Sequence, residues 1–251
     1  MKHKLEEILR MTIEEYKERL GEIILARSFK YSDNPPFTLA SGRQSNYYFN
    51  CKPTTLDPEG MNLIGIIVFD MIKDYDVTAA GGLTLGADPI ANALSLISYQ
   101  KGKPIKSFIV RKDVKSHGTK SAVEGNVEAG EKVAIIDDVI TTGGSTIIAI
   151  EQARNAGLIA ERVITLIDRE EGGRENILKH VDHVESVFTR TEIMALRAKK
   201  IAAAIFNEKI SNRFYFYLHS IVFFMRSRFR GKSRNNSGRQ IHITGNASGS
   251  T

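Results

Sequence analysis

Residues 133–146 read VAIIDDVITTGGST, and this segment decides the fold. Its apolar, β-branched start predicts a buried strand, which leads into the adjacent carboxylates of Asp137 and Asp138. A turn rich in glycine and hydroxyl side chains follows, and a helical pattern begins at Ile147. A strand, a glycine turn and a helix in this order are typical of α/β proteins, which bind ligands at the carboxyl ends of their strands.

The turn has the chemistry of a phosphate site. Glycines let the backbone approach a ligand closely, and the amides at a helix N-terminus attract anions. The hydroxyls of Thr141, Thr142 and Ser145 add donors, and the two aspartates can hold the hydroxyls of a sugar. A simple strand-to-helix connection with a serine cap also fits Gly143-Gly144. Two adjacent carboxylates at a strand end, however, are costly unless they serve a function.

Two common nucleotide-binding motifs are excluded for this segment. It lacks the Gly-Lys-Ser/Thr of a P-loop and the G-x-G-x-x-G of a dinucleotide turn. It looks like the phosphoribosyl diphosphate (PRPP) motif of the type I phosphoribosyltransferases.

The body of the chain alternates short β-rich runs with helical ones. Thr12 and Glu15 form a capping-box pattern before the first helical run, and residues 37–50 predict a strand, a turn and a second strand. The alternation predicts an α/β domain with a largely parallel sheet covered on both faces. The expected strands are 77–82, 107–111, 132–137 and 162–168, and the expected helices are 12–27, 63–73, 88–100 and 145–156.

Residues 111–120, RKDVKSHGTK, form a basic loop without helical or strand periodicity. Several cations beside a histidine suit a diphosphate leaving group, whose negative charge grows in the transition state. A closing loop would also exclude water from a reactive glycosyl cation. The simpler interpretation is a solvated charged loop, which describes most runs of charge.

Together these segments resemble the orotate phosphoribosyltransferase family closely. The resemblance covers roughly residues 12–200 and rests on FTLASGRQSNYYF, GGLTLGADPIA, RKDVKSHGTK, VAIIDDVITTGGST and LIDREEGG, in the family's order. It implies the type I phosphoribosyltransferase fold, a mainly parallel sheet flanked by helices with a small hood subdomain. The implied reaction transfers the 5-phosphoribosyl group from PRPP to orotate, giving orotidine 5′-monophosphate and diphosphate in de novo pyrimidine (UMP) biosynthesis. A cytoplasmic homodimer with shared active sites is also implied.

The resemblance assigns the catalytic and PRPP-binding roles. Asp137 and Asp138 would hold the ribose hydroxyls and stabilise positive charge on the sugar. Lys115 and His117 would act on the diphosphate from the neighbouring subunit's loop. The residues expected to bind PRPP are Arg111, Lys112, Lys115, His117, Asp137, Asp138, Val139, Ile140, Thr141, Thr142, Gly143, Gly144 and Ser145.

The resemblance also assigns an orotate site. Arg169 matches an arginine whose guanidinium suits a planar carboxylate, although an ion pair with Glu170 or Glu171 is the simpler interpretation without the family. Tyr48 and Phe49 fall where aromatic residues flank the orotate ring, and would otherwise be ordinary strand core. Thr141 completes the set of residues expected to bind orotate, which is Thr141, Arg169, Tyr48 and Phe49.

Two departures from the family concern cations. Ala40 stands where some relatives have a lysine that contacts PRPP, and residues 81–89, which match the diphosphate loop, contain no lysine. The basic loop must then carry more of the cationic role, with Arg43 as a helper.

No metal-binding side chains are expected. Mg²⁺ usually binds through substrate oxygens with few carboxylates, so we expect it to enter mainly through PRPP. His180 and His183 have no further ligands at suitable spacing and predict a surface pair. Cys51 is the only cysteine, which excludes an internal disulfide.

The positive charge of the chain is concentrated at its end. The 251 residues carry a net charge of +6, yet residues 206–251 have eight basic residues against Glu208, a net charge of +7. Residues 1–205 therefore carry −1. We expect a catalytic domain at 1–205 and an atypical aromatic and basic extension at 206–251, disordered or non-native, with neither nucleic acid nor a membrane as partner. The N-terminal residues do not resemble a secretory signal.

Two other functions remain open at this point. A regulatory protein of the same fold could bind nucleic acid, but this predicts a basic face on a body whose net charge is −1. A purine-base transferase shares the acidic pair but gives Arg169 no carboxylate to meet.

Overall fold

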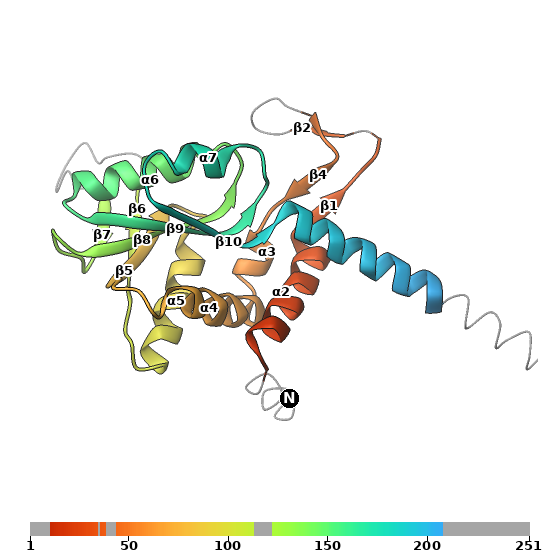
Figure 1. Ribbon diagram of the computed structural model, residues 1–251, viewed down its shortest axis with the longest axis horizontal. Helices are drawn as coiled ribbons and strands as arrows, with labels where there is room; N and C mark the ends of the chain where they lie inside the picture. Colours follow the sequence, from red (N-terminus) through yellow and green to blue (C-terminus); the bar gives the residue numbers. More distant parts are fainter. Residues whose placement is uncertain (1–10, 35, 39–43, 113–121, 208–251) are drawn as a thin grey trace, which may run out of the picture. The chain divides into compact units, whose positions relative to one another are not determined.

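A computed structural model describes residues 11–34, 36–38, 44–112 and 122–207 (Figure 1). The chain separates into two compact units, residues 1–198 and 199–251. In the second unit the described residues, 199–207, are helical and exposed. The domain boundary predicted at 205/206 stays a prediction.

The first unit is built on a six-stranded sheet of order β10-β9-β8-β5-β6-β7. All neighbouring pairs are parallel except β6 with β7, which is antiparallel. This confirms the predicted α/β class. The strands are β5 (Ala79–Leu83), β6 (Lys106–Val110), β7 (Val123–Gly125), β8 (Lys132–Ile140), β9 (Ile159–Asp168) and β10 (His183–Thr189).

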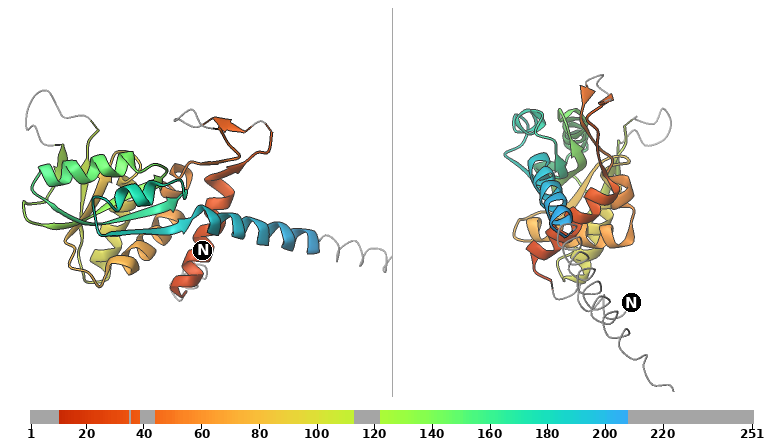
Figure 2. Two further views of the ribbon diagram at one scale, coloured as in Figure 1. Left: turned by 45° about the horizontal axis from the view of Figure 1, so that its top comes forward. Right: turned by 90° about the vertical axis from the view of Figure 1, so that its right-hand side faces the viewer.

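Helices cover both faces of the sheet, as its uninterrupted apolar strands require. In β8, Ala134 and Ile136 belong to a core shared with α2, α4 and α5, whereas Val133 and Ile135 belong to a core shared with α6 and α7. Figures 1 and 2 show these two groups on opposite sides of the sheet. The helices are α2 (Ile13–Arg27), α3 (Lys52–Thr55), α4 (Pro58–Ile72), α5 (Asp88–Gln100), α6 (Gly144–Asn155) and α7 (Gly173–Ile177).

Two small antiparallel ribbons lie beside the main sheet (Figure 1). β1 pairs with β4, where the tilted rings of Phe29 and Phe49 have centroids 5.2 Å apart, and β2 pairs with β3. They correspond to the small subdomain that the resemblance implies. The strands are β1 (Phe29–Tyr31), β2 (Phe37–Thr38), β3 (Gln44–Ser45) and β4 (Tyr47–Phe49).

The predicted elements are all present, with different bounds in several cases. The capping box of Thr12 and Glu15 is formed at the start of α2. β8 continues through the acidic pair to Ile140, whereas the predicted strand ended at residue 137. The sequence analysis did not predict β1, β7, β10, α3, α7 or the helix over residues 190–207.

Among the described residues, none of the helices combines the length and apolar character needed to span a membrane.

The α5 helix offers a matched test of the packing. Leu94 is fully buried in the core beneath the sheet, and Leu96, two positions along, is 61% exposed. We expect Leu94→Ala to lower the free energy of unfolding by about 2–5 kcal/mol, because it removes core contacts and leaves a cavity. Leu96→Ala should stay within about 0.5 kcal/mol of the parent. Urea denaturation followed by circular dichroism measures both, and equal losses would contradict the packing described.

Candidate active site

The sheet reverses its direction of winding between β5 and β8. The chain continues from β5 to β6 on one side, and from β8 to β9 and β10 on the other. Loops after β5 and β8 therefore diverge at the carboxyl edge of the sheet and leave a crevice, the usual ligand site of open α/β sheets. Residues 84–87 follow β5 at this edge, and residues 141–143 follow β8.

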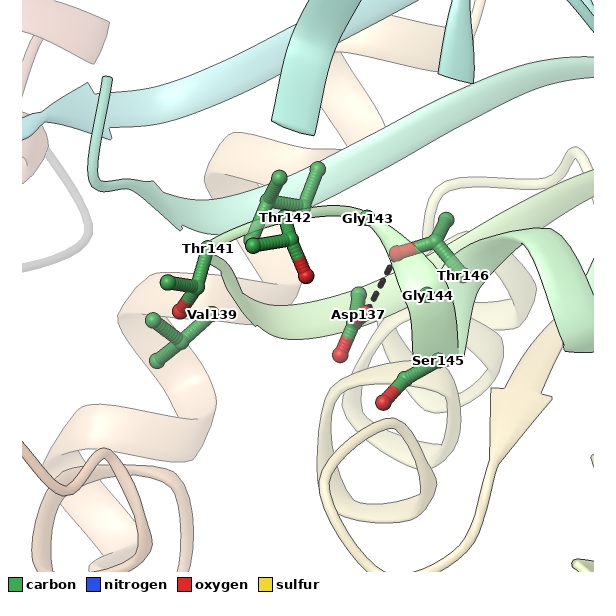
Figure 3. A pocket seen from close by; sticks show the side chains of 9 residues that line it. Asp137, Val139, Thr141, Thr142, Gly143, Gly144, Ser145 and Thr146 are labelled. Atoms are coloured by element: carbon green, nitrogen blue, oxygen red, sulfur yellow. Dashed lines mark hydrogen bonds between the residues drawn. The ribbon is translucent and has the colours of Figure 1, made fainter. Parts of the chain in front are cut away.

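The turn after β8 lines a cavity of about 210 Å³. Gly143 has a φ of 85°, a left-handed conformation that a side chain would strain. No side chain caps the first turn of α6, so its amides remain to bind an anion. The lining residues are Asp137, Val139, Ile140, Thr141, Thr142, Gly143, Gly144, Ser145 and Thr146 (Figure 3).

Asp137 is a buried carboxylate, 9% exposed, at the base of this cavity. Its Oδ2 accepts a hydrogen bond of 2.5 Å from the Thr146 hydroxyl, and its Oδ1 accepts one of 2.9 Å from the amide of Asp138. Burial and, to a lesser degree, the charge of Asp138 raise the pKa of Asp137 to about 7, even though the hydrogen bond from the Thr146 hydroxyl lowers it. This group therefore titrates near neutral pH.

Asp138 is partly buried and lies against the loop that follows β5. A Cβ at Gly86 would come within 2.4 Å of Asp138 Oδ1, so a side chain at this position would force the carboxylate to shift. Burial raises the pKa of Asp138, whereas the charge of Lys52 at the start of α3 lowers it. The acidic pair thus contacts both loops of the crevice: Asp138 lies against the loop after β5, and Asp137 lines the cavity of the turn after β8.

Thr146 is a site residue that the sequence analysis did not assign. Figure 3 shows its hydroxyl directed toward Asp137. The signal was its position: Thr146 lies on the buried stripe of α6 with Ala149, Ile150 and Ala153. A hydroxyl on an apolar stripe needs a hydrogen-bond partner, and the acidic pair is nearby in the sequence.

Arg169 lies directly beside the turn. Its amide donates to the carbonyl of Ile140 at 3.0 Å, which holds the end of β9 against the end of β8. Its guanidinium is 5% exposed, and Nη2 lies 2.7 Å from Oε1 of Glu171. The ion pair considered in the sequence analysis is therefore formed, with Glu171. Arg169 does not line the cavity of the turn.

The two predicted ring-flanking residues differ in environment. Tyr48 is 40% exposed, with its ring 5.9 Å from that of Phe37. Phe49 is buried against Phe29 and Tyr47, because successive residues of a strand face opposite sides. In this structure Phe49 is therefore part of the core, as in the simpler interpretation.

The basic loop is described only at its start. Arg111 follows β6 at the carboxyl edge of the sheet, and its Nη1 lies 3.4 Å from Oε1 of Glu124. Lys112 is exposed. Lys115 and His117 lie outside the described residues, as do Ala40 and Arg43.

These features indicate which ligand the site can bind. An anion cradle of amides and hydroxyls adjoins two carboxylates, which suits a phosphorylated sugar. A largely parallel sheet that carries an acidic pair and an anion turn at its switch point is the arrangement of the type I phosphoribosyltransferases.

Comparison with known proteins narrows the class. No family model matches the chain. The chain is 46% identical over 178 residues to the orotate phosphoribosyltransferase of Aquifex aeolicus (strain VF5), covering 71% of this chain and 97% of that relative. Two crystal structures of Mycobacterium tuberculosis H37Rv orotate phosphoribosyltransferase, in complexes with Fe(III) dicitrate and with PRPP, give TM-scores of 0.62 and 0.59. Their identities are 32% and 31%, and each alignment covers 71% of this chain and 98% of that one.

The chain belongs to the orotate phosphoribosyltransferase family. It is an enzyme, a transferase of pyrimidine biosynthesis.

The bond between Thr146 and Asp137 generates a pH-dependent prediction. If an ionised Asp137 binds the sugar, kcat/KM falls as pH drops through the pKa of that group. Thr146→Val removes the donor that lowers this pKa, so the acid limb of the profile should move upward by about one pH unit. Thr146→Ser keeps a hydroxyl and should retain the parent limb. A kcat/KM profile from pH 5.5 to 9 measures this, and an unmoved limb in the valine variant contradicts the role of the bond.

Proposed function

We propose that this enzyme transfers the 5-phosphoribosyl group from PRPP to orotate, giving orotidine 5′-monophosphate and diphosphate, and that residues 137–146 bind the sugar phosphate. One observation carries the proposal: the acidic pair and the anion turn lie together at the switch point of the sheet. The relatives named orotate phosphoribosyltransferase, one of them in complex with PRPP, supply the reaction.

The turn binds the 5′-phosphate. Amides at the start of α6 and the hydroxyls of Thr141, Thr142 and Ser145 surround the cavity, so the phosphate exchanges water for several directed donors. Val139 and Ile140 line the same cavity. The phosphate then fixes the ribose beside the two carboxylates.

The acidic pair acts on the ribose. Asp137 and Asp138 accept hydrogen bonds from its 2′- and 3′-hydroxyls. When the bond to diphosphate lengthens, positive charge develops on the sugar ring, and two nearby carboxylates in a buried site stabilise it. Thr146 keeps Asp137 oriented and favours its ionised form.

The diphosphate leaves against the basic loop. Arg111 and Lys112 follow the carboxyl end of β6. In the sheet, β5 lies between β6 and β8, the strand that carries the acidic pair. With Lys115 and His117, these two basic residues neutralise the charge that the leaving group acquires. Lys115 and His117 come from the neighbouring subunit of a homodimer.

Mg²⁺ bound to the oxygens of PRPP would need few ligands from the protein. Within the described residues, no group of three or more acidic, histidine or cysteine side chains could hold a metal. An ion held mainly by substrate oxygens fits this donor set, since Mg²⁺ keeps waters and phosphate oxygens as ligands. Bound there, it supplies positive charge to the diphosphate.

Orotate binds beside the turn, with its carboxylate on Arg169. The hydrogen bond from the Arg169 amide to Ile140 fixes this arginine next to Thr141, which also contacts the base. Tyr48, half-exposed on β4, covers the ring, with Phe49 supporting it from the core. The reaction takes place in the cytoplasm, and the extension at 206–251 contributes none of these residues.

Single substitutions test the assigned roles. Asp138→Asn removes a carboxylate and Lys115→Ala removes a cation, and each should lower kcat at least about a hundredfold. The spectrophotometric loss of orotate with PRPP and Mg²⁺ measures turnover. Asp182→Asn, the same change at an exposed position, is the control and should match the parent. Parent-like turnover in both site variants would refute the roles, and no consumption of orotate by the parent would refute the function.

Mixing these two variants tests the shared site. If Lys115 acts on the neighbouring subunit, a dimer of one Lys115→Ala and one Asp138→Asn subunit contains one fully intact site. Random exchange of subunits should then restore about a quarter of the parent activity, because half of the dimers are mixed and half of their sites are intact. If the loop serves its own subunit, each site keeps one defect and the mixture stays inactive.

A further inference from the structure

Arg169 is held by the charged side chain of Glu171 as well as by its own backbone hydrogen bond to Ile140. Its guanidinium and the carboxylate of Glu171 are both almost fully buried, with side chains 6% and 7% exposed, and Nη2 lies 2.7 Å from Oε1. The ring of Tyr47 on β4 lies 5.2 Å from the guanidinium carbon. The arginine proposed to bind orotate therefore has fixed neighbours before any substrate arrives.

The contacts continue from Glu171 to Arg190, the first residue of the helix over residues 190–207. The Tyr47 hydroxyl donates to Glu171 Oε1 at 3.2 Å and accepts from Nη1 of Arg190 at 3.0 Å. The guanidinium of Arg190 also lies 5.5 Å from the Tyr47 ring. Three segments distant in the sequence thus meet around one carboxylate: β4, the end of β9 and the helix that begins at residue 190.

Within the part of the chain that the structure describes, the ion pair with Glu171 leaves two buried nitrogens of Arg169 without a well-aligned hydrogen bond. Neither Nε nor Nη2 of Arg169 makes a directed hydrogen bond among the described residues, although the two charges are close. Buried N–H groups without an acceptor are costly, so these donors are suited to an incoming ligand. A buried ion pair is favourable only when further hydrogen bonds hold it, and the Tyr47 hydroxyl provides one to Glu171.

We propose that Glu171 is a positioning residue, which holds the Arg169 guanidinium in the orientation that meets the carboxylate of orotate. The inference rests on the proposed role of Arg169. Tyr47 and Arg190 support the carboxylate from behind. The orotate site is then tied to β4 and to the residue-190 helix, while the PRPP site is built on the turn after β8.

Because Glu171 acts through Arg169, its loss should affect one substrate and not the other. Glu171→Gln keeps the shape but removes the charge, and we expect the KM for orotate to rise about tenfold, with the KM for PRPP within about twofold of the parent. The preference for orotate over uracil, which lacks the carboxylate, should fall by the same factor. A merely structural role for Glu171 would not change the two substrates differently.

Two further variants sharpen the test. Tyr47→Phe removes only the hydroxyl that holds Glu171 and should raise the KM for orotate about threefold; this variant decides the question if Glu171→Gln does not fold. Glu175→Gln is the matched control, because Glu175 is exposed on α7 and has no contact with Arg169, Tyr47 or Arg190 among those given by the structure. Its KM for orotate should match the parent.

The outcomes separate this inference from the proposed function. If Arg169→Gln leaves the KM for orotate unchanged, the proposed orotate site is wrong and the inference falls with it. If Arg169→Gln raises that KM but Glu171→Gln and Tyr47→Phe do not, the site stands and the positioning role is refuted. A lower KM for orotate in Glu171→Gln would also overturn the inference, because Glu171 would then compete with the substrate.

Discussion

The burial of one carboxylate directly beside another is the constraint on which the rest of this site depends. Asp137 loses most of its hydration at the end of β8, and Asp138 adds like-charge repulsion. The Thr146 hydroxyl and the backbone amides offset part of this cost. The position that α6 takes after the turn is therefore linked to the ionisation of the acidic pair, since the helix supplies the stabilising hydroxyl.

The order of strands places the other parts around this pair. The reversal between β5 and β8 brings the loop at Gly86 against Asp138, while the end of β9 brings Arg169 beside Ile140. The residues proposed to bind the sugar, the leaving group and the base thus come from different strands, all at one edge of the sheet. A sheet wound in a single direction would separate these loops.

Features built from consecutive residues could be predicted from the sequence, whereas contacts between distant residues could not. The acidic pair, the glycine turn and the following helix are consecutive in the chain, so residues 133–146 reveal them through periodicity and turn chemistry. The bond of Tyr47 to Glu171 joins residues 124 positions apart, and no local pattern records it. The strands β1, β7 and β10 were missed because brief strands and strands at the edge of a sheet carry little periodicity. Phe49 was assigned to the ligand by family match, yet strand alternation turns it into the core.

The contact between Gly86 and Asp138 also limits where this enzyme can obtain positive charge. A lysine at residue 86 would bring its Cβ to 2.4 Å from an oxygen of Asp138, and this carboxylate would have to move from its present position. The loop after β5 therefore contributes close packing in place of charge at that position. The cations must come from other segments, such as the loop that starts at Arg111 or the amino end of α3 at Lys52. The absence of a side chain at Gly86 thus leaves room for the Asp138 carboxylate where a cation would otherwise stand.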